Sequence, residues 1–304
     1  MARVLLIHNP AAARTGPEVV KSICDLFQAE GWTIDAAGTT KTGDAVGLAR
    51  QGVVDGVDVV AVYGGDGTMM QAVSGMLGSG VPLGVIPGGT GNLLAGNLRL
   101  PKKPTEAVYA IMRGVPRQID LGRVQFDKEV RHFAVACGAG FDAELMAATT
   151  TDSKQRWGMF AYVAKALSTI PGLIPLTHRV TVDGDTMEFK AVSVMVLNCG
   201  EIIPNLLQFG KDISPDDGLL DMVALNASGY AEGIDIIVRL LTGHANGSDR
   251  VRFARGRTIR VECDGESLVE LDGEPVDRTP FTAEVVPGAL TVLVPKGGGN
   301  GTRA

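Results

Sequence analysis

The first third of the chain alternates short apolar segments rich in β-branched residues with longer segments whose apolar residues recur at helical spacing. The pattern predicts strands over residues 3–10, 32–38, 58–65 and 82–89, and helices over 16–31, 42–52 and 67–80, with a further helix within 98–122. Such alternation makes a parallel sheet with helices on both of its faces. We therefore expect an N-terminal α/β domain.

The character of the sequence changes after residue 122, where short strand-like runs are joined by turns that contain Asp-Gly. These runs are residues 123–126, 130–138, 178–185, 188–200, 219–226, 257–265, 267–274 and 289–295. Two helical segments interrupt them, at 141–169 and 230–242. Because 304 residues exceed the usual size of one core, we expect two domains. The α/β domain spans 1–118, which the segment 287–304 can rejoin, and a mostly antiparallel β-rich domain spans 119–286.

Composition narrows the class of protein. With 45% hydrophobic and 20% charged residues the chain is globular, and no apolar run approaches the ~18 residues of a membrane span. The opening apolar run, residues 4–8, is too short for a signal peptide, so we expect a cytoplasmic protein. A net charge of -6 argues against a nucleic-acid partner. The four widely spaced cysteines indicate buried free thiols.

A glycine-rich turn, Gly64-Gly65-Asp66-Gly67-Thr68, follows the third predicted strand. Glycines let the backbone approach a ligand closely, and amides at a helix start attract anions, so this turn suits phosphates. An ordinary tight turn explains the glycines alone equally well. Asp66 favours the phosphate site, because a carboxylate beside phosphates needs a bridging cation such as Mg²⁺. Thr68 can cap the helix or bind a phosphate oxygen.

A second glycine turn, residues 87–92, follows the next predicted strand. Neighbouring crossovers bring both turns to one edge of the sheet, where open α/β folds bind ligands, so we expect one extended polyphosphate site. Other fingerprints are absent or misplaced. No P-loop, zinc or serine-hydrolase motif occurs, and the dinucleotide-like sequence at 138–143 lies outside the alternating part of the chain.

Six short motifs occur in a characteristic order. They are "GGDGT" at 64–68, "PGGTGN" at 87–92, "IDLG" at 119–122, "GAGFDAE" at 138–144, "PDDGLLD" at 215–221 and "LDGE" at 271–274. Together they resemble the diacylglycerol kinase catalytic domain family of bacterial lipid kinases, which is related to sphingosine and ceramide kinases and more remotely to NAD kinases and phosphofructokinases. The resemblance covers nearly the whole chain.

The resemblance implies an NAD kinase-like α/β domain and a β-rich domain, with ATP bound in the cleft between them. By similarity, the nucleotide contacts come from the turns of the α/β domain: Asn9, Pro10, Ala11, Thr40, Gly64, Gly65, Asp66, Gly67, Thr68, Met69, Met70, Gly89, Thr90 and Asn92. The first turn departs from the family, because Ala13 and Arg14 replace its small Ser-Gly ending.

The resemblance also assigns chemistry to three acidic positions. Glu274 would accept the proton of the lipid hydroxyl, while Asp66 with Mg²⁺ would supply more of the acceleration through charge. Ser214, Asp217 and Leu219 would hold a structural Mg²⁺, through one carboxylate and two backbone carbonyls. From the residues alone, "LDGE" reads equally as an Asp-Gly hairpin with an exposed glutamate, and residues 214–221 as a solvated turn.

Two segments are candidates for contact with the lipid substrate or the membrane. Residues 157–176 are apolar and broken by prolines, which suits either membrane or acyl-chain contact or a helix packed on the β-rich domain. Residues 250–260 carry five arginines in a predicted strand pair and could meet anionic headgroups, or form a solvated strand face.

The sequence thus predicts an ATP- and Mg²⁺-dependent lipid kinase of phospholipid metabolism. It would be cytoplasmic and peripheral to the inner face of the membrane, as a monomer or a homodimer, and its substrate would be a diacylglycerol-like, sphingoid or ceramide lipid. Two alternatives stay open: a soluble-substrate kinase of the NAD kinase type, and a nucleotide-binding regulator without turnover.

Overall fold

The computed structural model describes residues 1–12, 14–140, 174–203, 207–210, 212–242 and 248–296. The chain divides into two compact units, Met1–Ile119 with Gly288–Ala304 and Asp120–Pro287. It passes from one unit to the other within β5 (Val115–Gln125) and within β18 (Phe281–Val294). The helix predicted over 141–169 lies outside the described residues, as does most of the apolar segment 157–176.

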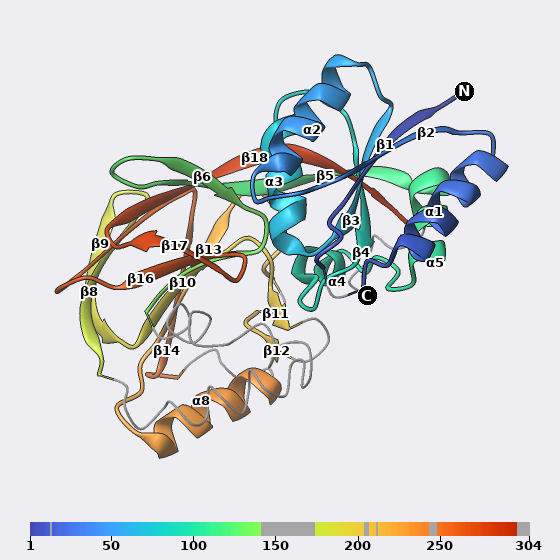
Figure 1. Cartoon of the computed structure of the whole chain (residues 1–304). Coiled ribbons are helices and arrows are strands. Elements are labelled where there is room, and N and C mark those ends of the chain that lie inside the picture. The colour runs from blue at the N-terminus through green and yellow to red at the C-terminus, as the bar shows by residue number, and fades with distance from the viewer. Residues whose placement is uncertain (13, 141–173, 204–206, 211, 243–247, 297–304) are drawn as a thin grey trace. The chain divides into compact units, whose positions relative to one another are not determined.

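The first unit is a parallel sheet with helices on both faces, as predicted (Figure 1). Its elements are β1 (Arg3–His8), α1 (Pro17–Ala29), β2 (Thr33–Gly38), α2 (Asp44–Val54), β3 (Val59–Gly64), α3 (Asp66–Met76), β4 (Leu83–Pro87), α4 (Leu93–Asn97) and α5 (Pro104–Arg113). The strand order is β2-β1-β3-β4, and all three pairings are parallel. The end of β18 adds a further parallel strand beside β4. All four carboxyl ends of β1 to β4 therefore lie at one edge.

Alternate residues of the central strands face opposite helical layers. Val4 and Leu6 of β1 join a buried cluster with Phe27 of α1 and Val108 of α5. The intervening residue, Leu5, instead lies against α2 on the other face. Figure 1 shows α1 and α5 on one side of the sheet and α2 and α3 on the other. Both faces are therefore buried, which explains why these strands read as continuous apolar runs.

Helices α2 and α3 approach each other closely at Gly75, where an added Cβ would lie 2.2 Å from the carbonyl oxygen of Val46. We expect Gly75→Ala to lower the free energy of unfolding by about 1–3 kcal/mol, because inserting a methyl group into a packed contact forces the backbone to move. Gly47→Ala is the matched control, since a Cβ there meets no atom within 4 Å. It should stabilise α2 by up to ~1 kcal/mol. Urea denaturation measures both, and equal stability of the two variants would contradict the packing.

The second unit is an antiparallel β-sandwich, as predicted. Its first sheet has the order β14-β13-β10-β7-β16-β17, formed by β14 (Val251–Gly256), β13 (Leu220–Leu225), β10 (Ser193–Leu197), β7 (Ala136–Gly140), β16 (Leu268–Leu271) and β17 (Glu274–Arg278). Its second sheet contains β5, β6 (Val130–Phe133), β8 (Leu176–Val182), β9 (Asp185–Ala191), β15 (Thr258–Cys263) and the first part of β18. Outside the sheets lie α8 (Tyr230–Thr242), as predicted, and a short pair, β11 (Glu201–Ile203) and β12 (Leu207–Gln208).

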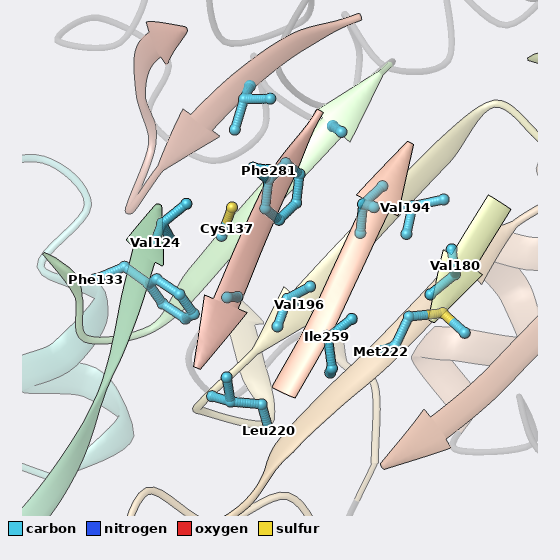
Figure 2. Packing of buried hydrophobic residues seen from close by; sticks show 14 of the residues in the cluster. Val124, Phe133, Cys137, Val180, Val194, Val196, Leu220, Met222, Ile259 and Phe281 are labelled. Atoms are coloured by element: carbon cyan, nitrogen blue, oxygen red, sulfur yellow. The ribbon is translucent and has the colours of Figure 1, made fainter. Parts of the chain in front are cut away.

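The core of this unit lies between its two sheets. Figure 2 shows Cys137, Val194, Val196 and Met222 of the first sheet meeting side chains of the second, among them Val180, Ile259 and Phe281. All of these residues are buried. The alternation of inward and outward residues along each strand is what places them on the facing surfaces. Two of the four free thiols, Cys137 and Cys199, are buried as expected, whereas Cys24 and Cys263 are partly exposed.

Three predicted strand units were wrong, because each one divides between the two sheets. Residues 130–138 form β6 and β7, and residues 188–200 form β9 and β10, each with its two halves in different sheets. The arginine-rich residues 250–260 also do not form a strand pair. Strand β14 pairs with β13, whereas β15 pairs with β8 and β18. The apolar pattern continues through each change of sheet, which is why local periodicity does not mark it.

Most of the arginines in residues 250–260 have partners in the structure. Arg250 forms an ion pair with Asp235 at 2.7 Å, and Arg260 forms one with Glu262 at 2.9 Å. Arg255 binds both carboxylate oxygens of Asp221. These carboxylates offset the cationic patch that the sequence suggested for anionic headgroups. Among the described helices, none has the length and apolarity that crossing a membrane requires.

Candidate active site

Four turns of the first unit follow the carboxyl ends of β1 to β4, at the edge where open α/β sheets bind ligands. They comprise residues 9–16, 39–43, 65 and 88–92. Hydrogen bonds join them to one another. The amide of Arg14 donates to the carbonyl of Gly88 at 3.1 Å, and that of Gly88 donates to Gly64 at 2.8 Å. The turns therefore form one connected rim.

Asn9 ties the first turn to the glycine turn after β3. Its side-chain amide donates to Thr68 Oγ1 at 3.1 Å, and its Oδ1 accepts from the amide of Ala11 at 2.9 Å. Thr68 is buried, so its hydroxyl serves this contact inside the rim. Tyr63, beneath the rim, donates from its hydroxyl to the carbonyl of Arg14. Apart from its place at the end of a predicted strand, this buried tyrosine has no distinguishing pattern in the sequence.

The glycines allow the two glycine turns to pack backbone against backbone. A Cβ on Gly89 would lie 2.6 Å from the Cα of Gly65, and one on Gly88 would lie 3.1 Å from the amide nitrogen of Gly64. Asn92 fixes the second turn, because its side chain both accepts from the amide of Gly89 and donates to its carbonyl. Thr90 is exposed at the tip of this turn. The predicted neighbourhood of the two turns is thus present in the structure.

The start of α3 is suited to an anion. Its N-cap residue is Gly65, which has no side chain that could accept hydrogen bonds from the amides of the first turn. Such amides carry partial positive charge and bind phosphate groups. Met69 of this helix is buried, and its amide donates to the carbonyl of Gly65 at 3.1 Å.

Asp66 bridges the two glycine turns. Its Oδ1 accepts from the amide of Leu93, the first residue of α4, at 2.8 Å. A Cβ on Gly91 would lie 2.9 Å from its Oδ2, so that oxygen also faces the second turn. The carboxylate therefore lies at the rim, half-buried, between the two predicted phosphate-binding turns.

Thr40 lies on the turn before α2. Its amide and hydroxyl both donate to Asp44, and these bonds hold the pKa of the Asp44 carboxyl below its usual value. Gln71 of α3 accepts from the amide of Gly43 at 2.9 Å, which fixes this turn against α3. Gln71 could not be predicted as part of the site, because one glutamine on an amphipathic helix has no distinguishing pattern.

In the second unit, Glu274 is the first residue of β17 and is exposed. It follows a two-residue Asp-Gly turn from β16, in which Leu271 pairs with Glu274. Asp272 and Gly273 both have positive φ, at 50° and 88°, as this type of hairpin requires. The structure therefore contains the Asp-Gly hairpin that the sequence allowed, with Glu274 at its end.

The predicted metal loop, residues 214–219, closes on itself and on Asp120. Asp217 Oδ1 accepts from the amide of Leu219 at 3.0 Å, and Asp120 Oδ2 accepts from that of Gly218 at 2.7 Å. Burial, with smaller contributions from the charges of Asp120 and Asp216, raises the pKa of Asp217. The charge of Arg255 already offsets part of this negative charge, and a bound cation would offset more of it.

No group of three or more His, Cys, Asp or Glu side chains in the described parts of the chain is arranged to hold a metal ion. The set of Ser214, Asp217 and Leu219 contains one carboxylate and two carbonyls, so a cation there would depend on backbone oxygens. An ion at Asp66 would likewise need oxygens from a bound phosphate, which is how Mg²⁺ binds many nucleotide enzymes.

Comparison with known proteins identifies the family of the chain. The family model described as the diacylglycerol kinase catalytic domain matches residues 3–124, and that described as the YegS C-terminal NAD kinase beta sandwich-like domain matches residues 135–294. The chain belongs to the diacylglycerol kinase catalytic domain family. The second match covers the β-sandwich, so both units of this lipid kinase family are present.

Individual relatives agree with this family. The diacylglycerol kinase of Mycobacterium tuberculosis is 30% identical, with 84% of this chain and 82% of the relative covered. That of Bacillus subtilis is 27% identical over 90% of each chain. A crystal structure of a Bacillus anthracis protein superposes with a TM-score of 0.80 at 27% identity, covering 96% of this chain and 95% of that one. The predicted family, fold class and enzyme class are thereby confirmed.

Proposed function

We propose that this lipid kinase uses ATP and Mg²⁺ to phosphorylate a hydroxyl of a diacylglycerol-like, sphingoid or ceramide lipid. The observation that carries the proposal is the connected rim of glycine turns with Asp66 between them, in a chain that belongs to a lipid kinase family. The proposal extends to peripheral attachment at the inner face of the membrane, where such a lipid would be presented.

The rim supports phosphate binding in three ways. Gly64, Gly65, Gly88 and Gly89 have no Cβ, so the backbones of the two turns lie against each other and a ligand can approach both closely. The uncapped start of α3 supplies positive partial charge. The carboxylate of Asp66 would hold Mg²⁺ beside the phosphates. The ion would neutralise the charge that develops on the transferred phosphoryl group.

The proposal also assigns Glu274 as the general base. An exposed carboxylate at the end of a rigid turn can accept the proton of the lipid hydroxyl as its oxygen attacks the γ-phosphorus. Asp217, with the carbonyls of Ser214 and Leu219, would hold a Mg²⁺ ion that orders the loop without taking part in the reaction. In phosphoryl transfer most of the acceleration comes from alignment and charge neutralisation, so Asp66 is the more important carboxylate.

The test is incubation of the purified protein with radiolabelled ATP and Mg²⁺ against three acceptors: dispersed diacylglycerol, ceramide or sphingoid base, and NAD. We expect label in a lipid and none in NAD. Label in NAD would favour the soluble-substrate kinase. ATP binding without transfer to any acceptor in a total lipid extract would favour the regulator. Mass spectrometry of the labelled lipid identifies the substrate.

A further inference from the structure

Asp272 is a buried carboxylate at the turn that precedes Glu274. Only 8% of its surface is exposed, and it forms no ion pair with any of the residues that the structure describes. Buried acids without a cationic partner are rare, because desolvation of the charge is costly. The turn alone does not explain an aspartate, since Asn-Gly suits the same hairpin without this cost.

The contacts of Asp272 explain the carboxylate. Its Oδ2 accepts from the amide of Ala134 at 2.8 Å, and its Oδ1 accepts from the amides of Val135 and Ala136 at 2.8 and 3.0 Å. Its own amide donates to the carbonyl of Ala136 at 2.9 Å. Three amide donors need two acceptor oxygens, which a carboxylate has and a carboxamide lacks. Asp272 thus clamps the hairpin to residues 134–136, the connection between β6 and β7.

The same connection is held from its other side by Asn198, which is fully buried. The side-chain amide of Asn198 donates to the carbonyl of Ala134 at 2.8 Å and to that of Asp120 at 2.9 Å. The backbone amides of Asn198 and Cys199 both donate to the carbonyl of Val135. Residues 134–136 are therefore fixed within the core of the sandwich, and they form a rigid support for the hairpin.

We propose that Asp272 is a positioning residue for phosphoryl transfer, which fixes the carboxylate of Glu274 by clamping the β16–β17 turn to residues 134–136. The inference rests on the role proposed for Glu274. A carboxylate that must meet a substrate hydroxyl gains from a rigid support, because a misplacement of about 1 Å can cost ~10²-fold in rate. Burial raises the pKa of Asp272 to about 6, with a smaller contribution from the charge of Glu274, and the hydrogen bonds from the three amides oppose that rise.

The first test is Asp272→Asn, which keeps the turn but offers one acceptor oxygen to three amides. We expect kcat for lipid phosphorylation to fall about 10- to 100-fold with little change in the KM for ATP. Amide hydrogen exchange at residues 134–136 should accelerate. Asp277→Asn on β17 is the control, because Asp277 is exposed and, within the part of the chain that the structure describes, bonds only the neighbouring amide of Arg278. It should leave kcat and exchange unchanged.

A double-mutant cycle with Glu274→Gln distinguishes positioning from general stability. If Asp272 acts by placing Glu274, adding Asp272→Asn to Glu274→Gln lowers kcat no further. Additive losses, or a wild-type rate in Asp272→Asn, would overturn the inference while the role of Glu274 stands. A wild-type rate in Glu274→Gln alone would remove the proposed base. Should Asp272→Asn fail to fold, Asn198→Ala, which loosens residues 134–136 from the other side, enters the same cycle with the same expectation.

Discussion

Replacement of Glu274 with glutamine is expected to reduce lipid phosphorylation by about 10²- to 10⁴-fold, the usual contribution of a general base. Glutamine has nearly the same shape and cannot accept the proton, so the variant isolates the chemical role. Glu274 is exposed at the start of β17, and its replacement should leave the fold unchanged. ATP affinity should stay near the wild-type value, because the nucleotide contacts are proposed on the other unit.

The measurements are kcat by radiolabel transfer and the dissociation constant of ATP by calorimetry. Glu266→Gln is the matched control, because Glu266 is an exposed acid in the turn before β16, and its ion pair among the described residues is a loose one to Arg278, at 3.6 Å. Activity equal to wild type in Glu274→Gln would exclude this residue as the base. Loss of ATP binding in the same variant would show that its effect is not confined to proton transfer.

Replacement of Asp66 with asparagine is expected to reduce activity by about 100-fold or more at every Mg²⁺ concentration, the scale seen when one preorganised electrostatic group is lost. Asparagine retains an oxygen that can accept from the amide of Leu93, so the contact between the glycine turns survives. The loss would then follow from the missing negative charge, which no longer holds the cation beside the phosphates.

Activity measured across a Mg²⁺ titration, with a thermal melt of each protein, tests this expectation. Asp25→Asn on α1 is the control, because Asp25 is exposed and its ion pair among the described residues is with Lys21, one helical turn away. Full recovery of the Asp66→Asn variant at high Mg²⁺ would mean that the carboxylate contributes affinity for the ion and no rate. An unchanged rate at low Mg²⁺ would remove Asp66 from the site.

The first unit was predictable because its signals are local. Apolar periodicity identified the strands β1 to β4 and the helices α1, α2, α3 and α5, and the glycine turns followed two of the strands directly. It did not identify the start of β5. In the second unit the same periodicity gave most strands but missed where the chain changes sheet, as at Val192 between β9 and β10. Such a change depends on pairing with distant strands, which no local pattern records.

The sequence identified candidate residues for the site, but few of the hydrogen bonds between them could be predicted from it. The sequence placed Asp66 within the first of two glycine turns, but its bond to the amide of Leu93 depends on how two crossovers pack. The role of Asp272 was missed, because the motif drew attention to the glutamate after the turn. Its three amide donors lie more than a hundred residues earlier, in a connection without distinctive composition.

Amide hydrogen exchange with and without a non-hydrolysable ATP analogue and Mg²⁺ tests whether the glycine rim binds the triphosphate. We expect slower exchange at residues 65–68 and 90–91, since these amides would lie against phosphate oxygens, and no comparable change on the outer face of α1. The amides of Gly88 and Gly89 already donate within the rim, so they are not part of this expectation. Binding of the analogue with unchanged exchange in both turns would contradict it.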